Sequence, residues 1–186
     1  MGDKLIRLKI EEFLALLKEN LGMYLSPEES ELLEDAKKKN SVIIKGLKSE
    51  ESFDVYLTGH IDFETVRMFY EITRKLEDFG VKVYHPAMVV LGSKEKGIFE
   101  FNIERKSRIL LVVTDTASFG TSVDVGFFTH RKLSGEDVKI IYCYTGPSYE
   151  FKEIKKHPSS VYIDYFTDDV EDALKKVLEL LGKPSL

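Results

Sequence analysis

The sequence contains a single cysteine, no glutamine and no apolar run long enough to cross a membrane. A membrane-spanning helix needs roughly 18 or more largely apolar residues, so an integral membrane protein of the helical kind is not expected. Cys143 lies in the apolar run 138–144, which favours a buried structural thiol over a nucleophile or half of a disulfide. We therefore expect no redox chemistry, and the lack of a secretory signal's apolar core predicts a cytoplasmic protein.

Basic and acidic residues are interleaved along the chain, so neither forms a long run of like charge. The net charge is −5. This pattern predicts no extended nucleic-acid surface, although one pocket could still bind a small anion. The absence of glutamine, with abundant Lys and Glu, is typical of proteins from thermophiles. A length of 186 residues, with 43% hydrophobic residues, predicts one domain with a sizeable core plus an appendage.

The N-terminal region is predicted to be helical. Apolar residues recur at helical spacing over residues 4–21, and Ser-Pro-Glu-Glu at residues 26–29 is typical of the start of a helix, here running towards Lys39. The apolar residues 42–44 suggest a short strand. We assign residues 1–52 to a helical extension that packs on the core or on a second subunit.

From residue 53 onward, strand-like and helix-like segments alternate. The run 109–113 is apolar at every position, which is typical of a central parallel strand covered on both faces. Residues 53–186 are therefore predicted to form an α/β domain with a doubly wound, five-stranded parallel sheet of the flavodoxin or Rossmann-like kind. The predicted strands are 53–58, 81–84, 109–114, 138–144 and 161–165, and the predicted helices are 63–79, 98–106, 121–132 and 168–181.

Two turns of this domain are candidates for a binding site, because ligands of doubly wound sheets bind beyond the strands' carboxyl ends, where the strand order reverses. The first turn contains Gly59, which would let a ligand approach the backbone. The second, residues 115–126, combines hydroxyls, a glycine and Asp124. Asp124 has two interpretations from these residues: a capping box with Thr121, which they favour, or a functional carboxylate.

Taken in order, segments within residues 55–181 resemble the nucleoside 2-deoxyribosyltransferase superfamily. The most similar branch is that of the 2'-deoxynucleoside 5'-monophosphate N-glycosidases. The similarity lies in residues 55–59, 74–80, 118–126 and 162–166. The resemblance implies that Asp124, at the position of the family's catalytic Glu, is the nucleophile and that Tyr56 orients it. It also implies that Glu100 holds the substrate and helps to protonate the leaving base; a solvated charge at a helix end is the alternative for Glu100.

The resemblance further implies substrate-binding positions and partners. The binding positions are Thr58, Gly59, His60, Ser118, Gly120, Thr121 and Ser148. The implied partner is a nucleoside or nucleotide, and the implied assembly is a homodimer or larger. No cofactor is expected, and without a His, Cys and Asp cluster at ligand spacing no metal site is expected either.

The chemistry of N-glycosidic cleavage explains why two carboxyl groups would be needed. Breaking the C1'–N bond builds positive charge on the sugar, which a carboxylate can stabilise or capture, while a second acid protonates the base. We therefore expect cleavage or transfer at this bond. Two alternatives remain: a nucleotide-binding regulatory domain that has lost catalysis, and a glycohydrolase of a dinucleotide such as NAD.

Overall fold

The computed structural model describes residues 7–185 and divides the chain into two compact units. The first unit comprises the described part of residues 1–52 together with residues 85–106. The second comprises residues 53–84 and the described part of residues 107–186. One boundary coincides with the predicted one at residue 52, whereas residues 85–106 group with the N-terminal helices.

The first unit contains α1 (Ile10–Asn20), α2 (Pro27–Ser49), the 3-10 turn η1 (Pro86–Met88) and α4 (Ser93–Glu104). The start of α2 is confirmed, because the Ser26 side chain accepts a hydrogen bond from the Glu29 amide at 3.2 Å and the Glu29 carboxylate accepts one from the Ser26 amide at 2.9 Å. The Asn40 amide group bonds the backbone carbonyl oxygen and amide of Val90, at 2.8 and 3.1 Å.

Two predictions for this region are wrong. The first helix begins at Ile10, later than expected; residues 4–6 lie outside the described part of the chain. The strand predicted at residues 42–44 is part of α2, which continues to Ser49. The buried residues Ala36, Asn40, Ile43 and Leu47 follow helical spacing, so burial along one helix face outweighs the strand preference of the β-branched residues.

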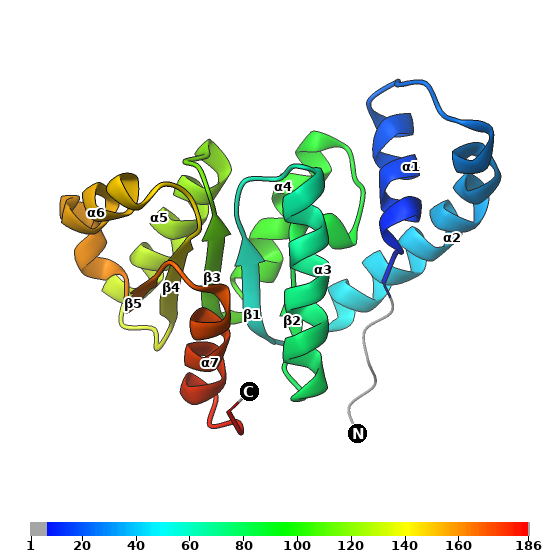
Figure 1. Ribbon diagram of the computed structural model, residues 1–186. Helices are drawn as coiled ribbons and strands as arrows, with labels where there is room; N and C mark the ends of the chain where they lie inside the picture. The colour runs from blue at the N-terminus through cyan, green and yellow to red at the C-terminus, as the bar shows by residue number, and fades with distance from the viewer. Residues whose placement is uncertain (1–6, 186) are drawn as a thin grey trace. The chain divides into compact units, whose positions relative to one another are not determined.

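The second unit is the predicted α/β domain core. Its elements are β1 (Phe53–Thr58), α3 (Phe63–Asp78), β2 (Val83–Tyr84), β3 (Ser107–Thr114), α5 (Phe119–Leu133), β4 (Lys139–Tyr144), α6 (Ser148–Lys156), the 3-10 turn η2 (Pro158–Tyr162), β5 (Tyr165–Thr167) and α7 (Val170–Leu180). All neighbouring strands pair in parallel, in the order β2-β1-β3-β4-β5 (Figure 1). The predicted flavodoxin or Rossmann-like fold class is confirmed.

Helices cover both faces of this sheet. Figure 1 shows α3 and α7 in front of the sheet and α5 behind it. Alternate residues of β1 and β3, such as Val55 and Leu111, join the core formed with α3 and α7, together with the fully buried Cys143. Burial raises the pKa of the Cys143 thiol to about 12, so the thiol stays protonated and its packing role agrees with the prediction.

Two elements differ from the predicted pattern. The strand expected at residues 161–165 begins only at Tyr165, because Pro158 opens a 3-10 turn that occupies the preceding residues. The helix α6 was not predicted; it spans only nine residues, and none of them is buried.

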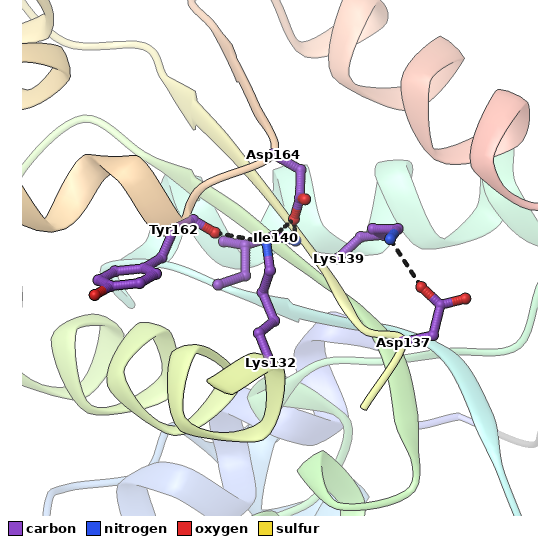
Figure 2. A network of polar contacts seen from close by, with 6 residues as sticks. All are labelled: Lys132, Asp137, Lys139, Ile140, Tyr162 and Asp164. Atoms are coloured by element: carbon purple, nitrogen blue, oxygen red, sulfur yellow. Dashed lines mark hydrogen bonds and ion pairs between the residues drawn. The ribbon is translucent and has the colours of Figure 1, made fainter. Parts of the chain in front are cut away.

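Asp164 fixes the chain as it enters β5 (Figure 2). Its carboxylate accepts hydrogen bonds from the Ile140 amide at 2.7 Å and from the Lys132 ammonium at 2.8 Å. The same ammonium donates to the Tyr162 carbonyl oxygen at 2.8 Å. One carboxylate thereby links α5, β4 and the segment before β5.

We predict that Asp164→Ala lowers the free energy of unfolding by about 1–3 kcal/mol, because the Ile140 amide and the Lys132 ammonium lose their acceptor. The matched control is Asp137→Ala, since Asp137 pairs with Lys139 at 2.8 Å but is 85% exposed. The control should leave stability nearly unchanged. Urea denaturation measures both variants, and equal effects would contradict the role of Asp164.

Candidate functional site

The candidate site lies at the carboxyl ends of β1 and β3, where the strand order reverses. From β1 the chain continues to β2 on one side, and the next strand, β3, lies on the other side of β1. Parallel register places Thr58 beside Val112, close to the end of β3. The His60 amide donates to the Thr114 hydroxyl at 3.4 Å. The two turns selected from the sequence therefore lie next to each other, as the sheet topology predicted.

A hydrogen bond connects Asp124 to the end of β1. The Thr58 hydroxyl donates to Oδ2 of Asp124 at 2.6 Å, a length typical of a hydroxyl bonded to a charged carboxylate. Thr58 is 3% exposed, and Asp124 is half-buried. The carboxylate is thus held in a fixed direction at the edge of the sheet.

The capping-box interpretation of Asp124 is wrong. Helix α5 begins at Phe119, two residues earlier than predicted, with Ser118 as its N-cap. The Ser118 hydroxyl accepts a hydrogen bond from the Thr121 amide at 3.2 Å and lies 2.7 Å from the Thr121 hydroxyl. Asp124 therefore falls in the second turn of the helix, where it bonds a strand residue and leaves the cap to Ser118.

Tyr56 lies on the same face of β1 as Thr58, because side chains alternate along a strand. Its side chain is buried, and its ring lies 5.4 Å from that of Tyr84. The orientation of Asp124 by Tyr56 stays a prediction. The orienting role of Thr58 was missed, although the alternation that pairs Thr58 with Tyr56 was a usable signal.

Gly59 has a packing role that the sequence did not reveal. A Cβ atom at this position would lie 2.0 Å from the carbonyl oxygen of Val113 on β3. The backbones of β1 and β3 thus approach too closely for any side chain, and this contact accounts for the glycine without a ligand. At Gly120, by contrast, a Cβ would meet nothing within 4 Å.

Asp62 caps α3, as predicted. Its carboxylate accepts hydrogen bonds from the amide and the hydroxyl of Thr65, each at 2.8 Å. The backbone hydrogen bond from Thr65 is the main cause that lowers the pKa of Asp62. The carboxylate is thereby directed towards its own helix.

The remaining predicted residues lie in different surroundings. Glu100 belongs to the first unit, on α4, where its side chain is 20% exposed and 3.8 Å from the Lys96 ammonium. It is therefore not a fully solvated charge, and its catalytic role stays a prediction. Ser148 is exposed and is the first residue of α6.

A groove of about 650 Å³ lies on another flank of α5. Ser118 and Thr121 line it, whereas Thr58, His60 and Asp124 do not. The structure therefore separates the predicted binding residues into two groups. Thr58 bonds the carboxylate of Asp124, whereas Ser118 and Thr121 border the groove.

No protein-family model and no curated protein sequence matches the chain. Within residues 7–185, no three His, Cys, Asp or Glu side chains are placed so that they could hold a metal ion. No helix in the same range is both long and apolar enough to span a bilayer.

We predict that Gly59→Ala lowers the free energy of unfolding by about 1–3 kcal/mol or more, because the added methyl group overlaps the Val113 carbonyl. The control is Gly126→Ala in the middle of α5, where a Cβ meets nothing within 4 Å. There, alanine should raise stability by about 0.5–1 kcal/mol. Thermal and urea denaturation of both variants provide the measurement. A Gly59→Ala protein as stable as the wild type would refute the close approach.

Proposed function

We propose that this protein binds a nucleoside or nucleotide at the carboxyl edge of β1 and β3 and cleaves or transfers its N-glycosidic bond, with Asp124 as the reacting carboxylate. The hydrogen bond from Thr58 to Asp124 is the observation that carries this proposal. A carboxylate can stabilise a cationic sugar only if it is charged and correctly aimed. A donated hydrogen bond supports both conditions, because it stabilises the ionised form and fixes one oxygen.

The position of Asp124 along α5 changes the expected source of this stabilisation. The field at a helix N-terminus acts mainly within the first turn, and Asp124 lies in the second. The Thr58 hydroxyl therefore supplies a stabilisation that the start of the helix does not. The bond also bears on the replacement of the family's Glu by the shorter Asp, because anchoring to β1 gives the shorter side chain a defined direction.

Discrimination between a nucleoside and its 5'-monophosphate is a finer part of the proposal. An anion at the start of α5 would compete for the Thr121 amide, which is already bonded to the Ser118 hydroxyl. This occupied cap favours a nucleoside over its 5'-monophosphate. Comparing the two as substrates at equal concentration tests this part separately.

Assembly as a homodimer or larger, in the cytoplasm, belongs to the same proposal. Phe119 and Val123 are 87% and 52% exposed on α5, one helical turn apart. Large apolar side chains at adjacent surface positions are typical of contact surfaces. Sedimentation or light scattering of the purified protein distinguishes a monomer from a dimer.

The direct test is to incubate the protein with nucleosides, 5'-monophosphates and NAD, and to separate the products by chromatography. Release of a free base from a nucleoside or monophosphate supports the proposal. Release of nicotinamide from NAD would indicate a dinucleotide glycohydrolase. Tight binding without release of a base would indicate a regulatory domain and contradict the proposed catalysis.

We predict that Asp124→Asn lowers kcat about a hundredfold or more, because an amide cannot stabilise the cationic sugar. The fold should persist, since the amide oxygen can still accept the hydrogen bond from Thr58. Thr58→Val should lower kcat about tenfold through the lost hydrogen bond, and Thr58→Ser should restore most of the activity. Steady-state kinetics measure kcat of each variant, and circular dichroism checks that each is folded. A wild-type kcat in Asp124→Asn would show that another group carries out the chemistry.

A further inference from the structure

The groove on the other flank of α5 has the dimensions of a small-molecule site. It lies between α5 and the segment that runs from α6 through η2, and its volume of about 650 Å³ falls in the range common for ligand pockets. Val125, Ile154 and Ile163 supply apolar lining. Because Asp124 does not line it, this site is separate from the proposed catalytic carboxylate.

Gly126 leaves room inside the groove. It lines the groove from the middle of α5, and a Cβ there would meet nothing within 4 Å. Alanine would therefore fit at this position, and as a better helix former than glycine it would stabilise the helix. Packing within the described residues therefore does not require the glycine, whereas a ligand lying against α5 would use the space.

Three residues that line the groove carry hydroxyl groups without a hydrogen-bond partner among residues 7–185. They are Tyr142, Thr129 and Tyr162. Tyr142 is half-buried on β4, and desolvation raises the pKa of its phenol, which keeps the proton available for donation. Partly buried polar groups are normally satisfied by a partner, by water or by a ligand.

The backbone of Tyr162 is anchored to α5. Its carbonyl oxygen accepts the hydrogen bond from Lys132 at 2.8 Å, and Figure 2 shows its ring extending away from that ammonium. Together with Tyr142, this residue gives the groove two aromatic rings. Tyrosine rings stack on flat ring systems while their hydroxyls make polar contacts.

The charges of the groove disfavour an anionic ligand. No Lys or Arg of the described chain lines it, and apart from the tyrosines its ionisable side chains are Glu153 and His157. Glu153 pairs with Lys156 at 3.0 Å, and the His157 ring is hydrogen-bonded to Ser159. A phosphate would therefore find no Lys or Arg side chain in the lining to pair with. A neutral ring, by contrast, would have only a small free-energy cost of desolvation.

We propose that this groove binds an uncharged heteroaromatic compound with hydrogen-bonding groups at its edge, a class that includes free purines. The flat ring lies against α5 at Gly126 and contacts the tyrosine rings. Its edge groups bond the hydroxyls of Tyr142 and Thr129. This site is additional to the proposed catalysis at Asp124 and does not depend on it.

Calorimetric titration with adenine tests the proposal, with adenosine 5'-monophosphate as the charged counterpart. Gly126→Leu should weaken adenine binding at least about tenfold by filling the groove, and Tyr142→Phe should weaken it by about three- to tenfold through one lost hydrogen bond. The matched control is Gly97→Leu in α4, where a Cβ also meets nothing within 4 Å. This control and Asp124→Asn should both bind adenine as the wild type does. Gly126→Ala serves as a milder variant if the leucine disturbs folding.

Several results would overturn this inference. They are the absence of saturable adenine binding at millimolar concentration, wild-type affinity in the Gly126 and Tyr142 variants, and equal or tighter binding of the monophosphate. Loss of adenine binding in Asp124→Asn but not in Gly126→Leu would place adenine at the carboxylate. That outcome would refute the groove site while supporting the proposed function, so the two ideas fail separately.

Discussion

The close parallel pairing of β1 with β3 is the contact on which the rest of the second unit depends. It brings the two backbones so near at Gly59 that the carbonyl of Val113 leaves no space for a side chain. The same pairing sets Thr58 near the end of β3, and Asp124, in the second turn of α5, accepts the hydrogen bond from Thr58. Sheet register, helix position and the direction of Asp124 are thus consequences of one backbone approach.

Most of the α/β core could be predicted because its signals are local and strong. A few neighbouring residues are enough to predict three of its features: the apolar strand β3, the strand Phe53–Thr58 and the helix cap at Asp62. The helix α6 was missed although it is amphipathic, because it spans only nine residues and none of them is buried. The end of α2 was missed for another reason: its β-branched residues suggest a strand, and only tertiary burial of one face decides for the helix.

The site was predictable as a location but not as a set of contacts. Sheet topology alone selects the turns after Thr58 and Thr114. The partner of Asp124 depends on where α5 begins, and each residue of error rotates a side chain by about 100° around the helix axis. A shift of two residues is therefore enough to confuse a capping residue with one that faces a strand. The role of Gly59 was hidden for a related reason, since a glycine in a turn does not reveal which distant backbone lies above it.

The interleaving of the two units along the chain has a consequence for biosynthesis. Residues 85–106 complete the first unit, but β1, α3 and β2 are made before them. On the ribosome, α2 must therefore emerge long before Val90, whose backbone Asn40 binds on both sides. In the second unit, β1 likewise cannot pair with β3 until residues 107–114 have been made. The first unit is complete only after residue 106, when the second unit still lacks residues 107–186, so the nascent chain holds part of the second core while the first is being completed.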